Sequence, residues 1–122
     1  MSGGIWGRIM NNREIDGIIA EKMMGWWLYN AGDYPLSCWM NSVDEVVVDQ
    51  AEYKPTINIA QAIEAIEQYC KSESKLFILR YSSPEPWRLS LGDGEGLLVA
   101  VTYGNTPALA ICEALVKAVS DD

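Results

Sequence analysis

The stretch LFILRYSSPEPWRLSLGDGEGLLVAVTYGNTP, residues 76–107, decides the fold. It holds three runs of β-branched, aromatic and other apolar residues, separated by two segments rich in proline, serine, glycine and acidic residues. That is the pattern of strands joined by turns. Connections this short cannot hold a crossover helix, so the strands are expected to form an antiparallel meander. The predicted strands are residues 76–81, 87–91 and 97–103.

Helix signals lie on both sides of this meander. Downstream, Thr106 stands where a cap would begin a final helix, which should run to about residue 119. Upstream, NIAQAIEAIEQYC (58–70) has Asn58 as a cap and Gln61 at the third helical position, like a capping-box partner. Its apolar residues recur at helical spacing and form one stripe.

The order of these elements predicts an α+β protein. A first helix is expected over residues 13–24, with Gly25 in the C-terminal capping position, and the valine-rich part of residues 26–53 leaves room for further strands. We therefore expect an antiparallel sheet packed between helices, an α/β/α-like sandwich. A length of 122 residues suits a single domain at residues 10–122, after a glycine-rich extension at residues 1–9.

The charge balance restricts the possible partners and chemistry. The chain has 17 acidic and 9 basic residues and no histidine, for a net charge of −8. Such a charge repels nucleic acids and anionic membranes, so the expected partner is a protein with a basic surface. The commonest general base is missing, and no nucleophile elbow, P-loop or zinc-ligand spacing occurs. We expect no enzymatic activity, no cofactor and no metal.

The three cysteines and the glycine-rich turn at residues 92–96 are each explained by a structural role. Cys38, Cys70 and Cys112 are far apart in the sequence and are expected to be free, buried thiols in a reducing compartment. The GDGEG turn at residues 92–96 is expected to be a solvated hairpin, since two carboxylates supply too few ligands for a hard cation.

Four blocks of the sequence resemble one family. They are NREIDGIIAEKMMGW (12–26), INIAQAIEAIE (57–67), WRLSL (87–91) and VAVTYGNTPALAICEALVKAV (99–119). In this order they are similar to the phage ABA sandwich domain family of small bacteriophage and prophage proteins. The resemblance implies a phage origin and a layered fold of sheet and helices, and it carries over no catalytic residues. Residues 33–55 depart most from the family pattern, and variable loops on a shared scaffold are where specific function usually resides.

The acidic segment 33–55 is the strongest candidate for a site. It has five carboxylates against Lys54 alone, interleaved with aromatic residues that provide contact area at low entropic cost. A merely solvated acidic face is the simpler alternative. Trp26 is expected to pack on the core, whereas Trp27 should point outward in an extended chain. The predicted partner-binding residues are Trp27, Tyr29, Tyr34, Trp39, Asp44, Glu45, Asp49, Glu52 and Tyr53.

Three functions are consistent with these features. The leading hypothesis is a non-enzymatic antagonist of a host antiviral defence system, of the anti-CRISPR kind, acting in the cytoplasm of the infected bacterium. Its carboxylates would replace phosphates in the basic groove of a host protein. The second is a sponge that sequesters a nucleotide immune signal. The third is a virion or morphogenesis component that associates with itself through apolar surface.

The nucleotide-sponge and defence-antagonist hypotheses each depend on particular residues. A nucleotide base would stack on Trp27 or Trp39, and its phosphate would bind the helix start at Gly104, Asn105 and Thr106, across the interface of a homo-oligomer. The first hypothesis requires carboxylates that are not neutralised within the chain. Ion pairs from Arg80, Arg88 or Lys54 to the acidic segment would contradict it.

Overall fold

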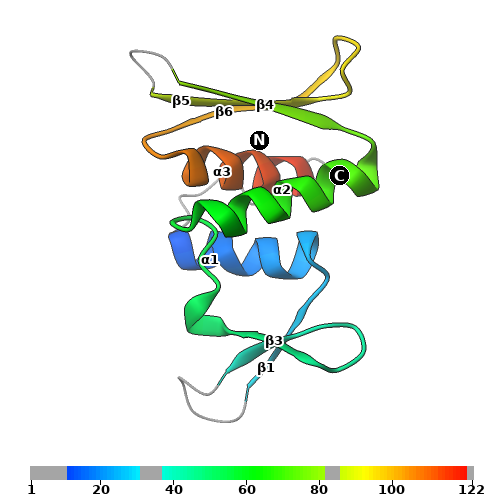
Figure 1. Ribbon diagram of the computed structural model, residues 1–122, viewed down its shortest axis with the longest axis vertical. Coiled ribbons are helices and arrows are strands. Elements are labelled where there is room, and N and C mark those ends of the chain that lie inside the picture. The colour runs from blue at the N-terminus through cyan, green and yellow to red at the C-terminus, as the bar shows by residue number, and fades with distance from the viewer. Residues whose placement is uncertain (1–10, 31–36, 82–85, 121–122) are drawn as a thin grey trace, which may run out of the picture.

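The computed structural model describes residues 11–30, 37–81 and 86–120, and within them the helices lie between two antiparallel sheets (Figure 1). The predicted extension at residues 1–9 and Tyr34 lie outside this part of the chain. The elements in chain order are α1 (Asn12–Ile18), the π-helical η2 (Ile19–Met23), β1 (Trp27–Tyr29), β2 (Cys38–Met40), β3 (Val46–Asp49), the 3₁₀-helical η3 (Gln50–Glu52), α2 (Ile59–Glu73), β4 (Leu76–Tyr81), β5 (Trp87–Gly92), β6 (Leu98–Gly104) and α3 (Pro107–Ser120).

Side chains cap the starts of the helices. The side chain of Asn11 accepts a hydrogen bond from the backbone N–H of Glu14 at 2.8 Å. The carboxylate of Glu14 accepts one from the backbone N–H of Asn11, which completes a capping box. Thr106 accepts the backbone N–H of Leu109 at 3.1 Å, which confirms it as the cap of α3. These bonds satisfy N–H groups that have no partner within the helix.

Asn58 caps α2 as expected, but Gln61 does not complete a capping box. Asn58 accepts the backbone N–H of Gln61 at 3.1 Å. The amide of Gln61 turns instead to the preceding loop, where it accepts the backbone N–H of Lys54 and donates to the carbonyl oxygen of Glu52. The glutamine therefore fastens residues 52–54 to the start of α2.

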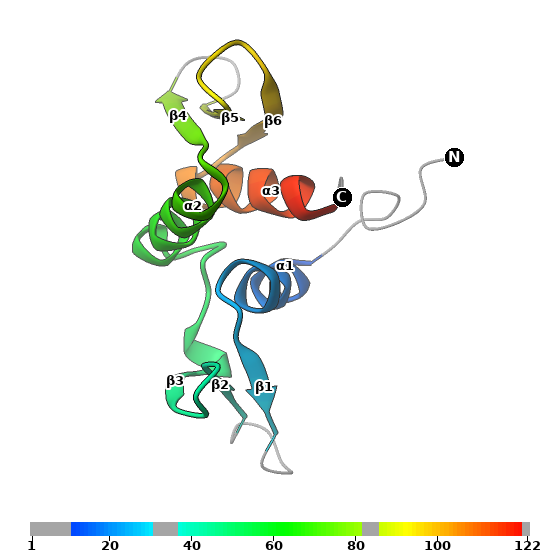
Figure 2. The ribbon, with the colours of Figure 1, turned by 90° about the vertical axis from the view of Figure 1, so that its right-hand side faces the viewer.

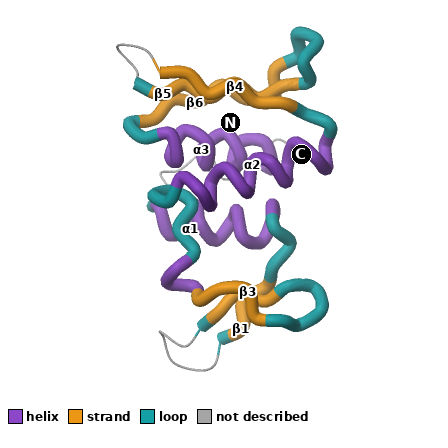
Figure 3. Tube along the Cα trace, viewed as in Figure 1, coloured by secondary structure: helices purple, strands orange, loops and turns teal. Residues whose placement is uncertain are grey.

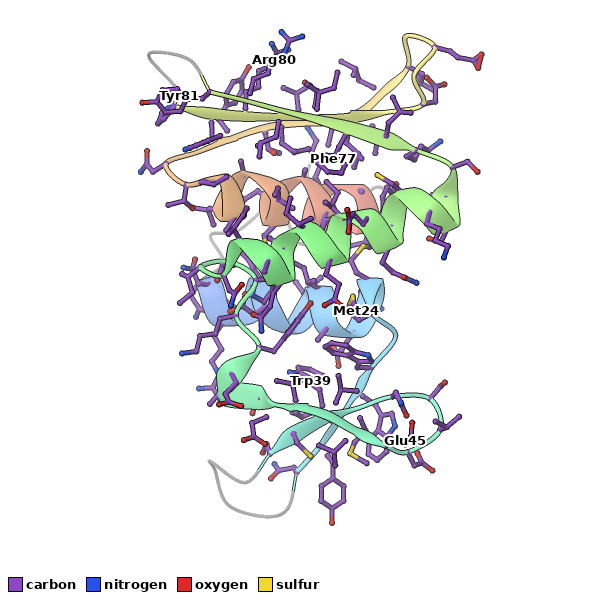
Figure 4. The ribbon with its side chains drawn as sticks, viewed as in Figure 1. Met24, Trp39, Glu45, Phe77, Arg80 and Tyr81 are labelled. Carbon is purple, nitrogen blue, oxygen red and sulfur yellow. The ribbon has the colours of Figure 1, made fainter. Side chains whose placement is uncertain are left out.

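The meander at the C-terminus is confirmed almost to the residue. β4, β5 and β6 pair antiparallel in sequence order and form what we call the C-terminal sheet. Every second side chain faces the helices, as Phe77, Leu89 and Leu91 do, and the others face away. In Figure 4, Phe77 points toward the helices and Arg80 points away from them.

The remaining strands form a second sheet at the opposite end of the molecule. β1, β2 and β3 pair antiparallel in sequence order and make up the N-terminal sheet. It accounts for the strands expected within residues 26–53. Gly25, at a φ of +72°, ends the first helix as predicted and turns the chain into β1.

The α+β class is confirmed, but the order of the layers differs from the α/β/α-like sandwich. Helices occupy the middle and sheets the two outer layers (Figure 3). α2 and α3 lie next to the C-terminal sheet, and α1 lies next to the N-terminal sheet (Figure 2). The physical reason is visible in α3, which is apolar around most of its circumference and is therefore stable only when covered on several sides. Its buried residues are Ala108, Ala110, Ile111, Cys112, Ala114, Leu115, Val116 and Ala118.

Small residues let α3 approach β6 closely. A Cβ atom added to Gly104 would lie 2.9 Å from the backbone nitrogen of Ala110, so only glycine fits there without displacement. The buried hydroxyl of Thr102 donates to the carbonyl oxygen of Ala110 at 2.6 Å. Among the described residues, no helix is both long and apolar enough to cross a bilayer.

Candidate functional site

The outer face of the N-terminal sheet presents exposed aromatic side chains. We use "outer face" for the side of a sheet that points away from the helices. Trp27 and Tyr29 lie two residues apart on β1, with 41% and 49% of their surface exposed, and their rings meet edge to face at 6.2 Å. In the sheet register, Trp27 pairs with Met40, and Tyr29 pairs with Cys38. The expectation that Trp27 points outward is confirmed.

Asn41 organises the β2–β3 hairpin beside this aromatic pair. Its side-chain oxygen accepts the backbone N–H groups of Val43 and Glu45 at 3.0 and 2.9 Å, and its amide donates to the Glu45 carboxylate at 3.0 Å. The indole N–H of Trp27 donates to the Asn41 carbonyl oxygen at 3.1 Å. Asp44 has a φ of +61°, which an aspartate tolerates better than most residues. Asn41 thus fixes the positions of both the Trp27 indole and the Glu45 carboxylate.

The four described carboxylates of the acidic segment lie in the β2–β3 hairpin, at the end of β3 and in the segment that follows it. Asp44 and Glu45 lie in the β2–β3 hairpin, where Figure 4 shows Glu45, while Asp49 ends β3 and Glu52 lies on η3. All four are exposed. Within residues 11–30, 37–81 and 86–120 none of them forms an ion pair. Their charge therefore faces solvent.

Trp39 and Tyr53, two of the predicted partner-binding residues, are buried instead. Trp39 is only 4% exposed because it lies between Leu28 and Val48 in the cross-strand row that faces α1 (Figure 4). Tyr53 is 3% exposed and packs edge to face on Trp26, with ring centroids 4.9 Å apart. Trp26 is packed against the core as predicted. The surface prediction for Trp39 and Tyr53 was therefore wrong.

A cleft of about 330 Å³ opens between α1 and the segment that follows β3. Two cationic residues, Arg13 and Lys54, line it together with Trp39 and Asp16. The Asp16 carboxylate accepts the backbone N–H of the buried Thr56 at 2.9 Å. Partial burial raises the pKa of Asp16 above its ordinary value, although the bond to Thr56 opposes that rise. The cleft is thus a mixed polar and aromatic site in an otherwise acidic molecule.

The two halves of the predicted nucleotide site lie at opposite ends of one copy of the chain, so that site would need a second copy. Gly104 and Asn105 line a shallow hollow with Tyr103 beside the C-terminal sheet, whereas Trp27 and Trp39 belong to the sheet at the opposite end (Figure 1). The hydroxyl oxygen of Thr106 accepts the backbone N–H of Leu109 and so caps α3. A base on either tryptophan and a phosphate at this helix start cannot belong to one ligand within one copy of the chain.

Several outward-facing residues were not predicted from the sequence. Cys38, which was expected to be buried, is partly exposed on the outer face of the N-terminal sheet, in register with Tyr29. Met40 and Val46 lie in register with Trp27 on the same face. The C-terminal sheet has an exposed apolar outer face of its own, made by the alternate residues of β4 and β6. The signal for the latter was present in the sequence, because several outward positions of β4 and β6 are apolar like the inward ones.

Comparisons with known proteins agree on the fold. The family model described as phage ABA sandwich domain matches residues 17–116, from α1 to the last turns of α3. No curated protein matches the sequence. The crystal structure of a phage protein from Bacillus cereus ATCC 14579 is similar, with a TM-score of 0.65 and 14% sequence identity, over 91% of this chain and 94% of that chain. At this identity the similarity concerns the fold alone.

Proposed function

Because the chain belongs to the phage ABA sandwich domain family, we propose that it is a phage-encoded binding protein without catalytic activity. In this proposal it antagonises a host defence protein by covering a basic surface, in the cytoplasm of the infected bacterium. One observation supports the proposal most directly. The outer face of the N-terminal sheet combines the exposed Trp27 and Tyr29 with carboxylates that have no counter-ion among the described residues.

The arrangement suits a groove that ordinarily holds phosphates. Trp27 and Tyr29 would form the apolar centre of the contact, where hot spots of protein interfaces usually lie. The carboxylates of Glu45 and Asp49 would accept hydrogen bonds from arginine and lysine side chains on either side of that centre. Since Asn41 already holds the hairpin, little conformational freedom is lost on binding.

We expect charge reversal around this face to abolish capture of the partner. The triple substitution Glu45→Lys, Asp49→Lys and Glu52→Lys places repulsive charges opposite a basic groove. Asp44 is left out of this triple variant, because its left-handed backbone disfavours lysine; a separate variant replaces it with asparagine. Pull-down from host lysate, followed by mass spectrometry, compares the proteins recovered by the variant with those recovered by the original chain.

A matched control separates local charge from total charge. Glu64→Lys, Glu67→Lys and Glu73→Lys change the net charge equally on exposed positions of α2. This control should recover the same partner as the original chain. Equal recovery by both triple variants would refute the acidic-face mechanism. Recovery of the protein with purified phage particles, in place of a host protein, would support the morphogenesis hypothesis.

The cleft beside Trp39 supports a second candidate function, the sequestration of a nucleotide signal. A volume of about 330 Å³ lies at the lower end of the range for small-molecule sites. Lys54 and Arg13 would attract a phosphate there, and Trp39 would form the apolar wall. Unlike the site predicted at Gly104, Asn105 and Thr106, this cleft needs no second copy of the chain.

We expect mononucleotides to raise the melting temperature if the cleft is their site. Ligand at about one hundred times its Kd stabilises a protein by about 2.7 kcal/mol, which differential scanning fluorimetry detects. The substitution Lys54→Glu should remove that rise. Lys71→Glu, at an exposed position on α2, is the control and should keep it. A melting temperature unchanged by nucleotides in the original chain would exclude this candidate.

A further inference from the structure

The outer face of the C-terminal sheet is an uncovered apolar surface at the opposite end from the proposed partner-binding face. Leu76 and Leu98, 54% and 58% exposed, lie in one cross-strand row on either side of Gly92. The next row along the strands contains Ile78, Ser90 and Val101. Large exposed apolar patches of this kind usually mark contact surfaces.

One end of this face is basic and lacks its counter-charges. Arg80 and Arg88 are direct cross-strand neighbours, in a row that Tyr103 completes, and Figure 4 shows Arg80 pointing away from the helices. Like charges in that relation are destabilising unless an anion lies between them. No ion pair to either arginine occurs in the described part of the chain, and the Nε atom of Arg88 is buried without a hydrogen-bond acceptor there.

The other end of the same face carries an acidic hairpin. The β5–β6 turn curls to the outer side of the sheet, away from the helices (Figure 1). The turn lies close to Leu76 of the outer face, because a Cβ atom added to Gly94 would lie 3.2 Å from the Leu76 side chain. The Asp93 carboxylate accepts the backbone N–H groups of Glu95 and Leu97, at 2.8 and 3.2 Å, and holds the turn closed. The exposed carboxylate of Glu95 therefore remains available at its tip.

We propose that this face binds the same face of a second copy of the chain, in a symmetric dimer. A two-fold axis along the row of Ile78 and Val101 places the arginine row of one copy over the leucine row of the other. Each arginine pair then reaches toward Glu95 of the opposite hairpin, while the apolar rows close on each other. The face is self-complementary only in this orientation, because a two-fold axis along the strands would bring arginines onto arginines.

The size of the face implies a weak, concentration-dependent dimer. Three strands of six or seven residues cover about 20 Å by 14 Å, which is small beside the roughly 800 Å² per partner of a standard interface. We therefore expect a Kd in the micromolar range. The dimer leaves the N-terminal sheet uncovered, so the proposed host partner could bind each copy independently.

Sedimentation velocity over a range of concentrations tests the dimer with a charge-swap cycle. Arg80→Glu alone and Glu95→Arg alone should each weaken association about tenfold, and the double variant should restore most of it, since the opposite charges meet again across the interface. Ile78→Glu puts two carboxylates near the axis and should leave only monomer. Val43→Glu makes the same kind of change at an exposed position at the other end of the molecule and should not alter the dimer.

Three results would overturn the proposal. A monomer at all concentrations excludes the dimer. Association that survives Ile78→Glu but not Val43→Glu transfers the interface to the N-terminal sheet. A double variant no stronger than either single variant shows that Arg80 does not meet Glu95 of the second copy. Circular dichroism of each variant ensures that a loss of association is not a loss of fold.

Discussion

Replacing Trp39 with alanine is expected to lower the free energy of unfolding by about 3–5 kcal/mol, the usual cost of removing a large buried aromatic side chain. Only 4% of Trp39 is exposed, and it belongs to the same core as Ile15 and Tyr53. The indole occupies the space between the N-terminal sheet and α1, so its removal leaves a cavity that this short sheet cannot close. Chemical denaturation followed by circular dichroism measures the loss.

Trp27→Ala is the matched control, because it removes the same side chain from the neighbouring strand. Trp27 is 41% exposed and loses one hydrogen bond and one edge-to-face contact, which together contribute about 1–2 kcal/mol. In binding assays the order should reverse, with Trp27→Ala impairing capture of the partner more than Trp39→Ala does. Equal losses of stability would contradict the inward placement of Trp39.

The different positions of these two tryptophans show where sequence patterns lose their power. β4, β5 and β6 have six or seven residues each, so the period of two repeats often enough to assign strands and faces. β1 and β2 have three residues each, and their outward and inward positions depend on pairing that no local pattern contains. Trp39 and Tyr53 were expected on the surface because they lie among acidic residues in the sequence.

The order of the layers escaped prediction for a related reason. The sequence pattern assigned each helix one apolar stripe, which leads to helices outside a sheet. In α3, however, Ala110, Ala114 and Val116 are buried as well as Ile111 and Leu115, so nearly the whole circumference is covered. Alanine satisfies both environments, and its burial becomes evident only when α1, η2 and α2 are placed on the side of α3 that faces away from the C-terminal sheet. The capping residues needed no such knowledge, because each acts within its own turn.

We also expect stability to fall steeply at alkaline pH because two buried groups resist ionisation. Burial raises the pKa of Tyr53 well above its ordinary value of 10.0 and that of Cys112 well above 9.0. The unfolded chain releases these protons at the ordinary values, whereas the folded chain keeps them. Stability is therefore complete below about pH 9 and declines above it, by about 1.4 kcal/mol per pH unit for each group once its unfolded form is ionised.

The double variant Tyr53→Phe and Cys112→Ala should flatten this decline, and the pH dependence of chemical denaturation between about pH 8 and 11 measures it. Other groups that titrate in the same range contribute equally to both proteins, so the difference in slope isolates these two. Tyr53→Phe should cost little at neutral pH, because its buried hydroxyl has no hydrogen-bond partner among the described residues. A slope that is the same in the original chain and the double variant would mean that the layer between α1, α2 and α3 admits enough water to ionise both groups.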